Sequence, residues 1–345
     1  MRCEILQEWD DILATFQKNN CDIYFFKKYL SLYESEKKHA LCAVCSENSN
    51  IMIMPYLRSE FLGYYDFETA YGYGGPISNI EDPDWCNKAF CAIHDYLKNN
   101  NYLCGFTRFH PLLDNERLVD AVSEEHKIQV IYDRQTIAID TSQSLDEIWT
   151  KQISSKNRNM IRKAEKNQLV YKTEFNFESF DEFIELYNAT MKRLTADDFY
   201  HFEQEYFYKL KESLAGNSFL GTVRKGGKLI CSAIFMYSNY YGHYHLEGSD
   251  YNYSGFGANN LLLWKAACEM HELGIKEFHL GGGTSSSKND SLFKFKKVFS
   301  SNEKRFFIGK EIFNEPVYRS ICTEWERNNS SKISIFGNRL LKYRY

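Results

Sequence analysis

The stretch that decides the fold is Phe278-His-Leu-Gly-Gly-Gly-Thr284, which is followed by Asp290-Ser-Leu-Phe-Lys-Phe-Lys-Lys-Val-Phe299. A strand pattern runs into three glycines, and a short, basic amphipathic helix comes after a polar turn. A similar unit lies upstream, since the strand Tyr241–Gly248 leads through Ser254-Gly-Phe-Gly-Ala-Asn-Asn260 into an apolar helix at Leu261. Two such units in succession predict two adjacent openings lined by backbone amides, as in a transferase cleft.

The composition limits how such a cleft can be interpreted. The chain has 345 residues, 43% of them hydrophobic, and a net charge of −4. This length predicts two domains. The negative charge gives no general case for nucleic acid binding, so a site for a polyanion must be local. Because no run approaches the length of a membrane span and the start MRCEILQEWDDIL is charged, we expect a cytoplasmic protein without a transmembrane segment.

The ten cysteines do not indicate a metal site. Cys42 and Cys45 are three positions apart, but no second pair of ligands stands near them. Buried thiols in a reducing compartment are the favoured interpretation, and no metal is predicted.

The first half alternates strands and helices. The expected elements are a hairpin of His39–Cys45 and Ile51–Leu57, a helix Asp84–Asn99, a strand Tyr102–Phe109, a helix Asn115–Glu125 and a strand Ile128–Ile139. The stretch Tyr71-Gly-Tyr-Gly-Gly-Pro-Ile77 interrupts them, because its glycines and proline disfavour a central strand. A helix with N-cap chemistry begins near Thr141, and we place the boundary there, giving domains 1–150 and 151–345.

The second half opens with the basic segment Lys151–Lys172, which holds seven Lys or Arg and a single acid, Glu165. Its basic residues form either a solvated helix face or a phosphate contact. The elements expected after it are a strand ending at Phe175, helices Phe180–Arg193 and Glu203–Leu214, and strands Ser218–Arg224, Lys228–Tyr237 and Tyr241–Gly248.

The glycine turn after the last of these strands has two interpretations. Unpaired backbone N–H groups at the start of a helix, beside glycines that let a ligand approach, suit a pyrophosphate or carboxylate. The alternative is a turn needed only for chain reversal. The spacing is G-x-G-A, and the G-x-G-x-x-G unit of a nucleotide-binding redox enzyme is not evident in the chain.

The order of the parts resembles the acyl-CoA N-acyltransferase fold called GNAT. Hairpin, strand, glycine turn, helix, strand, glycine turn and second helix follow one another. In that family the donor pyrophosphate lies at the N-terminus of the first helix and the acceptor enters between two splayed strands. The resemblance implies that these strands are Tyr241–Gly248 and Lys276–Leu280.

A closer resemblance is carried by six motifs between about residues 20 and 312. They are Tyr71-Gly-Tyr-Gly-Gly-Pro76, Lys156-x-Arg158-x-x-Ile161-x-Lys163-Ala164, Tyr244-x-Leu246-x-Gly248-Ser249, Asn259-x-Leu261-Leu262-x-Trp264, Leu280-Gly-Gly282 and Asp290-x-Leu292-x-x-Phe295-Lys296-x-x-Phe299. Together they resemble the Fem-type branch, which includes aminoacyl ligases that build peptidoglycan cross-bridges and related acyltransferases of envelope polysaccharide pathways. The resemblance implies an α/β (α+β) chain of two tandem GNAT-like domains, each a mixed, largely antiparallel central sheet flanked by helices, with the transferase cleft in the second.

The resemblance leaves the donor open. Fem-type ligases use aminoacyl-tRNA, whereas other members of the wider group use acyl-CoA, so we expect one of these as co-substrate and no bound cofactor. The long helical arm of some Fem-type ligases has no candidate here. The tyrosine that many acyl-CoA enzymes place on the last helix is also missing, since Phe293 and Phe295 stand in that segment.

Three residues are candidates for catalysis. Lys296 aligns with the family's Phe-Lys pair and would meet the acyl oxygen or a donor phosphate, unless it is an ordinary surface lysine. On helical geometry its neighbours Lys294 and Lys297 point elsewhere. Strand alternation predicts that His243, His245 and Glu247 share one face, and His245 or Glu247 would serve as the base or be a satisfied polar residue.

The substrate-binding candidates divide into a donor set and an acceptor set. The predicted donor-binding residues are Ser254, Gly255, Gly257, Ala258, Asn259, Phe295, Gly281 and Gly282. The predicted acceptor-binding residues are Tyr73, Gly74 and Gly75, which resemble a family turn, and Arg58 and Arg158 as phosphate clamps. Asp290 is expected to act mainly as an N-cap.

We therefore expect an N-acyltransferase that modifies an amine of an envelope precursor, either an amino sugar or a muropeptide. The expected partners are a nucleotide sugar, a muropeptide or a lipid-linked glycan, with tRNA as a further candidate. Peripheral contact with a membrane is compatible with this function, and a monomer or homodimer is expected. The alternative is a noncatalytic tandem module that binds a nucleotide sugar or tRNA.

Overall fold

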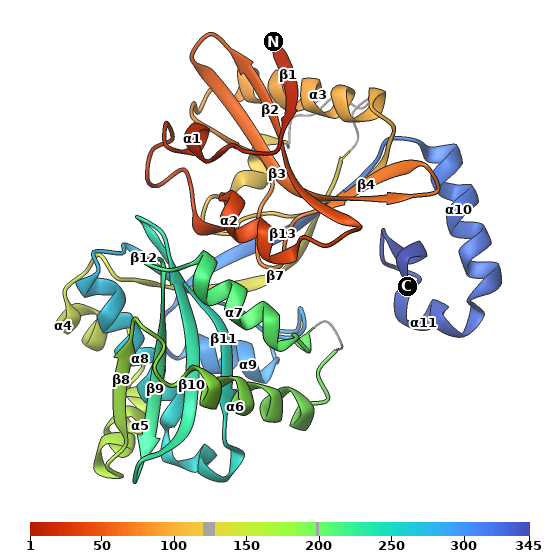
Figure 1. The fold of residues 1–345 in the computed structure, drawn as a ribbon. Coiled ribbons are helices and arrows are strands. Elements are labelled where there is room, and N and C mark those ends of the chain that lie inside the picture. The colour runs from red at the N-terminus through yellow and green to blue at the C-terminus, as the bar shows by residue number, and fades with distance from the viewer. Residues whose placement is uncertain (120–127, 198–199) are drawn as a thin grey trace. The chain divides into compact units, whose positions relative to one another are not determined.

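The computed structural model describes residues 1–119, 128–197 and 200–345, which form two compact units (Figure 1). Unit 1 comprises Met1–Asp133 and Arg305–Tyr345, and unit 2 comprises Arg134–Lys304. This division differs from the predicted ranges 1–150 and 151–345, because the last segment of the chain belongs to unit 1 although it follows unit 2 in the sequence.

The sheet of unit 1 has the strand order β1-β2-β3-β4-β6-β13. Its strands are β1 (Arg2–Leu6), β2 (Lys38–Glu47), β3 (Asn50–Phe61), β4 (Tyr64–Glu68), β6 (Tyr102–Arg108) and β13 (Asn302–Ile312), and the short β5 (Ile77–Ser78) pairs with β3. Neighbouring strands are antiparallel except β4 and β6, which are parallel. A parallel pair needs a crossover connection, and α3 (Pro83–Asn99) supplies it.

Helix α3 forms much of the core of unit 1. Asp82 caps its first turn by accepting hydrogen bonds from the backbone N–H groups of Asp84 and Trp85. The buried residues Trp85, Cys86, Ala89, Phe90, Ile93 and Leu97 recur at helical spacing and pack on the sheet. The shorter helices are α1 (Asp10–Leu13) and α2 (Lys27–Leu30), and α10 (Glu315–Asn328) and α11 (Ile333–Phe336) follow β13.

The sheet of unit 2 has the order β7-β12-β11-β10-β9-β8. Its strands are β7 (Ile128–Asp140), β8 (Val170–Glu174), β9 (Ser218–Lys225), β10 (Lys228–Tyr237), β11 (Tyr241–Ser249) and β12 (Glu277–Gly282). β11 and β12 are parallel, and the other pairs are antiparallel. The crossover between the parallel strands is α8 (Ala258–Glu272).

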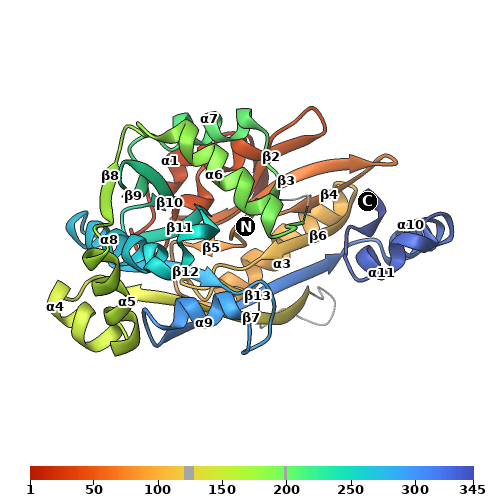
Figure 2. The ribbon, with the colours of Figure 1, turned by 90° about the horizontal axis from the view of Figure 1, so that it is seen from below.

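Helices cover both faces of this sheet, as Figure 2 shows. α6 (Phe180–Arg193) and α7 (Gln204–Ser213) lie on one face, and α5 (Ser155–Lys166) and α8 lie on the other. The core between α5, α8 and the strands combines aliphatic and aromatic side chains, with Ile161, Leu262, Ala266 and Phe278 among its fully buried residues. The remaining helices of unit 2 are α4 (Leu145–Glu147) and α9 (Ser291–Lys297).

The two units repeat one arrangement. In each, antiparallel strands lead into a single parallel pair whose crossover is a long helix, α3 in unit 1 and α8 in unit 2. Each sheet is therefore mixed and largely antiparallel, as predicted. In each unit, one strand beside the parallel pair comes from a distant part of the sequence, namely β13 in unit 1 and β7 in unit 2.

Most predicted elements are present, and the differences have local causes. The predicted helix Asn115–Glu125 is a 3₁₀ turn at Asn115–Leu118, and residues 120–127 lie outside the described part of the chain. The helix expected from Thr141 consists of α4 and a π-helical turn, Ile148–Gln152. Strand β13 and helix α10 were not predicted. Among the described residues, no helix is long and apolar enough to cross a membrane.

Candidate active site

The two parallel strands of unit 2 separate after three residue pairs. β11 and β12 pair at Tyr241 with Glu277, Gly242 with Phe278, and His243 with His279. β11 continues to Ser249 and β12 to Gly282 without further pairing between them. A fork therefore opens beyond His243 and His279, between the strands where the sequence predicted the splay.

A β-bulge lies on one arm of this fork. The register between β10 and β11 passes from Ile234 opposite Leu246 to Phe235 opposite Tyr244, so His245 is the extra residue of the bulge. An extra residue breaks the alternation of side chains along a strand. Glu247 consequently lies on the side of α8, where it meets Asn259, whereas the His245 ring lies 3.5 Å from the Tyr206 hydroxyl of α7.

The bulge makes one prediction wrong. His243, His245 and Glu247 were expected on one face of the strand, but Glu247 is on the opposite face from His245. The His243 ring packs edge-on against the His279 ring, with centroids 5.6 Å apart. Burial and the neighbouring His243 lower the pKa of His245 to about 3, so its imidazole is neutral at physiological pH.

Glu247 is the carboxylate at the fork. Its Oε1 accepts hydrogen bonds from Asn259 Nδ2 at 3.2 Å and from Cys231 Sγ at 3.7 Å. The Cys231 thiol is also 3.2 Å from Asn259 Oδ1, which fixes the amide orientation. Burial raises the pKa of Glu247, although hydrogen bonds from Ser249 and Cys231 oppose the shift. Glu247 is therefore a stronger base than an ordinary surface carboxylate.

Lys296 is the cation at the fork. Its side chain is 7% exposed, whereas Lys294 and Lys297 are exposed, as helical spacing predicted. Its Nζ donates a hydrogen bond of 2.7 Å to the carbonyl oxygen of Gly282 and lies 5.7 Å from the centre of the Tyr244 ring. Burial lowers its pKa to about 7, although the charges of Asp290 and Glu247 raise it. At neutral pH the amine is thus divided between its charged and neutral forms.

Glu247 and Lys296 influence each other's charge. The positive charge of Lys296 lowers the pKa of Glu247, and the carboxylate of Glu247 raises the pKa of Lys296. Burial pushes the two values toward each other, since it penalises both charged forms. A base and a proton donor with converging pKa values therefore line the same fork.

The glycine run between β12 and α9 is shaped by close packing. Gly281 has φ +76°, which favours glycine, and a Cβ there would lie 3.2 Å from Lys296 Nζ. A Cβ on Gly282 would lie 2.9 Å from the carbonyl oxygen of Gln135, and one on Gly283 would overlap the Asp290 carboxylate. Packing therefore explains the glycines at 282 and 283, whereas the bare Cα of Gly281 leaves room for the Lys296 amine, which is bound by the Gly282 carbonyl.

Asp290 fastens this turn to α9. Its Oδ1 caps the helix by accepting from Phe293 N at 3.0 Å, as the sequence predicted. Its Oδ2 accepts from the backbone N and the hydroxyl of both Thr284 and Ser285, at 2.7 to 3.1 Å. Although burial opposes the charge, these hydrogen bonds hold the pKa of Asp290 well below its usual range. The carboxylate therefore fixes the glycine turn against the helix that carries Lys296.

Five of the eight predicted donor-binding residues lie at the start of α8. Ser254 and Gly255 are exposed in the turn Tyr251–Phe256, and Gly257 occupies the N-cap position with φ +79°. A Cβ on Gly257 would lie 2.6 Å from the Met160 carbonyl oxygen of α5, so close packing requires this glycine. Within the described residues, no side chain caps α8, which leaves its first N–H groups available to an anion. Ala258 is the first helical residue, and Asn259 is bound to Glu247 as described above.

Two other predicted residues of unit 2 have structural partners. Arg158 Nη1 donates to the carbonyl oxygens of Trp149 at 3.1 Å, Thr150 at 3.4 Å and Ile153. It thus caps the π-helical turn before α5. Phe295 is half-buried in the core beside Phe299, with ring centroids 5.6 Å apart.

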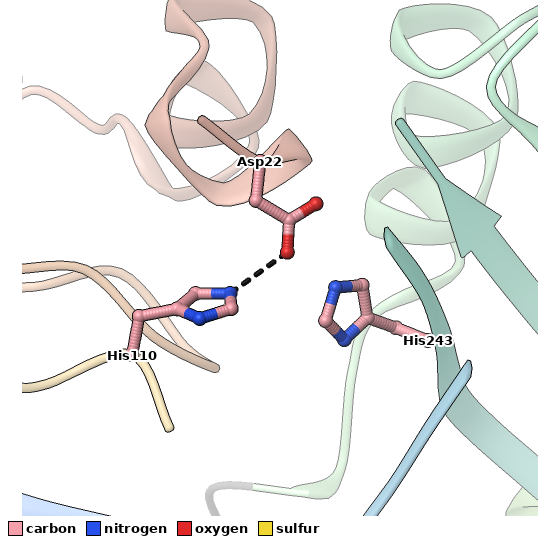
Figure 3. A group of neighbouring side chains, drawn as sticks. All are labelled: Asp22, His110 and His243. Carbon is pink, nitrogen blue, oxygen red and sulfur yellow. Dashed lines mark hydrogen bonds and ion pairs between the residues drawn. The ribbon is translucent and has the colours of Figure 1, made fainter. Parts of the chain in front are cut away.

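The predicted acceptor residues Tyr73, Gly74 and Gly75 lie in unit 1. Asn115 Nδ2 donates to the carbonyl oxygens of Gly74 at 2.8 Å and Pro76 at 2.9 Å, which holds the turn. The Tyr73 ring packs edge-on against the His110 ring at 5.5 Å. His110 Nε2 in turn lies 2.7 Å from a carboxylate oxygen of Asp22, as the dashed line in Figure 3 shows.

Arg58 also lies in unit 1, on β3. Its guanidinium stacks on the Tyr65 ring at 4.4 Å. It lines a cavity of 260 Å³ together with Lys27, Glu34 and His39. The position is compatible with a phosphate contact, but Glu34 places a negative charge in the same cavity.

Three residues of the fork were not predicted as site residues. Cys231, Tyr244 and Gln135 contribute through contacts that depend on the register of β10, on the bulge in β11 and on the pairing of β12 with β7. The motif Tyr244-x-Leu246-x-Gly248 was the available signal for Tyr244. Cys231 and Gln135 lie in ordinary strand sequence and carry no signal.

Residues 152–297 match the family model described as acetyltransferase (GNAT) domain. The matched range contains the fork, the start of α8 and Lys296. None of the curated protein sequences compared with the chain matches it.

Solved structures show the same fold over most of the chain. The structure described as FemX has a TM-score of 0.71 and 15% identity, covering 93% of this chain and 100% of its own. L-PGS from Bacillus licheniformis has a TM-score of 0.55 and 14% identity over 81% of this chain and 85% of its own. A tandem GNAT protein from the clavulanic acid biosynthesis pathway has a TM-score of 0.51 and 6% identity over 91% and 99%. The chain thus has the tandem GNAT fold, and its fold is similar to that of Fem-type proteins.

Proposed function

We propose that this protein is an N-acyltransferase that moves an acyl or aminoacyl group from an activated donor to an amine of a cell-envelope precursor. The observation that carries the proposal is the fork between β11 and β12, which is lined by Glu247 and Lys296. The GNAT family model over residues 152–297 and the fold shared with FemX support it. The co-substrate would be acyl-CoA or aminoacyl-tRNA, and the reaction would take place in the cytoplasm.

The donor would bind where α8 begins. Its first N–H groups carry the positive end of the helix dipole and have no side-chain cap in the described residues. A pyrophosphate or a terminal phosphate of the donor suits this position. The acyl carbon would then lie in the fork, where the strands no longer pair with each other.

The chemistry follows from the two charged residues. The acceptor amine must be neutral to attack the acyl carbon, and Glu247 would take its proton because burial raises the pKa of this carboxyl group. The new C–N bond forms as the bond to the leaving sulfur or oxygen breaks. Lys296, with a pKa of about 7, would stabilise the developing oxyanion and give a proton to the leaving group. Its bond to the Gly282 carbonyl holds the amine near this position.

The acceptor would be an amino sugar or a muropeptide carried on a nucleotide or a lipid. The residues proposed for it are Tyr73, Gly74, Gly75, Arg58 and Arg158. Support is strongest for the turn Tyr73–Gly75, whose backbone Asn115 holds in place. Support is weaker for Arg158, because three backbone carbonyls already accept hydrogen bonds from it.

The test is a transfer assay with each labelled donor against UDP-sugars, UDP-linked muropeptides and lipid-linked acceptors. We expect transfer by the unchanged protein, a loss of about 100-fold in Lys296→Ala and Glu247→Gln, and full activity in the control Lys294→Ala, since one proton-transferring group is worth about that factor. Absence of transfer from every donor, with substrate binding preserved, would instead favour a noncatalytic binding module. Full activity in Lys296→Ala would refute the assigned role.

A further inference from the structure

Unit 1 contains a second cavity, which the proposed function does not use. Its volume is about 470 Å³, within the range of small-molecule sites. All its lining residues belong to unit 1 and come from α3, the start of β7, the end of β13, α10 and the stretch after α11. The residues are His94, Lys98, Gln129, Lys310, Ile312, Phe313, Glu315, Tyr318, Gly337, Asn338, Arg339, Leu340 and Lys342.

Much of this cavity is built by residues outside the resemblance and the matched family model. The resemblance ends at about residue 312 and the family model at residue 297, whereas one side of the cavity is formed by residues 313–342. This part of the chain is fastened in place. The Tyr318 hydroxyl donates to the Leu340 carbonyl at 2.8 Å, and the Tyr343 hydroxyl donates to Asp66 Oδ2 at 2.7 Å. Trp325 Nε1 donates to the carbonyl of Tyr345 at 3.0 Å. The cavity is therefore formed before any ligand arrives, which lowers the entropic cost of binding.

The lining is basic, although the whole chain carries a net charge of −4. The lining contains one acid, Glu315, and four basic residues, which are Lys98, Lys310, Arg339 and Lys342. That carboxylate is already bound by Arg319, at 2.6 Å.

The four basic side chains differ in the interactions that they already make with the protein. Lys342 pairs with Glu326 at 2.7 Å, and Arg339 stacks on the Phe336 and Tyr345 rings at 4.9 and 4.8 Å. Lys310 makes only a long hydrogen bond of 3.4 Å, to the Asn338 carbonyl, among the interactions of the described residues, and Lys98 is exposed in the last turn of α3. These two ammonium groups are the ones a ligand would meet.

We propose that this cavity binds a small phosphorylated ligand, with Lys98 and Lys310 contacting its phosphate and Phe313 and Tyr318 forming the apolar wall beside its remaining part. Ammonium groups on two different elements, α3 and β13, suit a group with several charged oxygens better than a single carboxylate. The amide groups of Gln129 and Asn338 add neutral polar groups for an ester or hydroxyl. The phosphate belongs either to a soluble phosphate ester or to a phospholipid headgroup.

Titration calorimetry of the full chain with inorganic pyrophosphate tests the proposal. Sedimentation with phosphatidylcholine vesicles, prepared with or without phosphatidylglycerol, distinguishes a phospholipid headgroup from a soluble phosphate ester. The variant is Lys98→Ala with Lys310→Ala. The control is Lys18→Ala with Lys37→Ala, which removes the same charge from two exposed lysines of unit 1 that do not line the cavity. Both variants leave α8 unchanged, so a loss at the cavity is separable from binding at the proposed donor site.

We expect the cavity variant to weaken pyrophosphate binding about tenfold and the control to leave it unchanged, because two direct charge contacts are lost only in the first. If the protein sediments with phosphatidylglycerol vesicles and this binding requires Lys98 and Lys310, the ligand is a phospholipid headgroup. If the protein binds pyrophosphate but not the vesicles, the ligand is a soluble phosphate ester. Equal weakening in the two variants, or no effect in either, overturns the proposal. Circular dichroism and the urea midpoint of each variant show whether its fold is intact.

Discussion

The lowered pKa of Lys296 makes a quantitative prediction about stability. In the folded protein this amine has a pKa of about 7, whereas a lysine in the unfolded chain has its ordinary pKa of 10.5. The unfolded chain therefore binds more protons than the folded chain above pH 7, and stability rises with pH across this interval. Below the folded pKa both states are protonated, and the cost of burying the charge is fully present.

The magnitude follows from the same linkage. Between about pH 6 and about pH 8, the titration of Lys296 adds about 1.4 kcal/mol to the free energy of unfolding. Lys296→Met keeps the length of the side chain and removes the charge, so this gain disappears. Other groups also titrate in the interval, among them His245, whose lowered pKa destabilises the fold as the pH falls below the unfolded value. The contribution of His245 is common to both proteins and cancels in the comparison, because Lys296 is not among the causes of its shift.

The assay is urea unfolding followed by circular dichroism at the two pH values. We expect the gain between them to be smaller in Lys296→Met than in the unchanged protein by about 1.4 kcal/mol. The control Lys294→Met alters the exposed neighbour on the same helix and should leave the gain unchanged. An equal gain in the unchanged protein and in Lys296→Met would refute the buried, titrating lysine and with it the proton-donor role.

Three further predictions test the surroundings of the fork. Asp290→Ala should lower the free energy of unfolding by about 2 to 3 kcal/mol in urea titrations, because a helix cap and charged hydrogen bonds to the glycine turn are lost together. Gly257→Ala should cost more than about 2 kcal/mol, since the residue has φ +79° and its Cβ would press on a carbonyl of α5, whereas Gly255→Ala, with open space around its Cβ, should stay within about 0.5 kcal/mol. Under native conditions, iodoacetamide should modify Cys3 before Cys231, as peptide mass spectrometry would show, because a hydrogen bond with the thiol opposite it lowers the pKa of Cys3 whereas burial raises that of Cys231. The opposite order of modification would contradict this account.

Local pattern was sufficient for most of the fold. The strand at Lys228–Tyr237 and the helix at Phe180–Arg193 have the predicted bounds, because apolar periodicity and turn residues define them without distant contacts. Helical spacing predicted that Lys294 and Lys297 point away from Lys296, and both are exposed, whereas the place of Lys296 itself was predicted from the family resemblance. Local pattern could not predict that β13 belongs to the sheet of unit 1 although it follows unit 2 in the sequence, because a strand pattern does not say which sheet the strand will join.

The candidate site was only partly predictable for a related reason. Glu247 and His245 were read as neighbours on one face because strand side chains alternate, and the bulge at His245 reverses that alternation. No glycine marks the position, so the sequence shows no break there. The partners of Glu247, Asn259 and Cys231, come from α8 and β10, and they meet it only because of the register that the bulge sets.

The same bulge has a consequence for the chemistry. With regular alternation, Glu247 would face α6 and α7 together with His245, on the side of the sheet away from α9. The bulge places Glu247 on the side where it and Lys296 shift each other's pKa. Burial raises the pKa of the acid and lowers that of the amine, so the two pKa values lie closer together than those of an exposed carboxylate and lysine. A fork that takes a proton from an acceptor amine and returns one to a leaving group needs such a pair. Deleting His245 would join Tyr244 directly to Leu246 while both keep their partners Phe235 and Ile234 on β10. Glu247 should then stay on the side of α8 and transfer should be retained, and a loss of transfer with the fold intact would contradict this account.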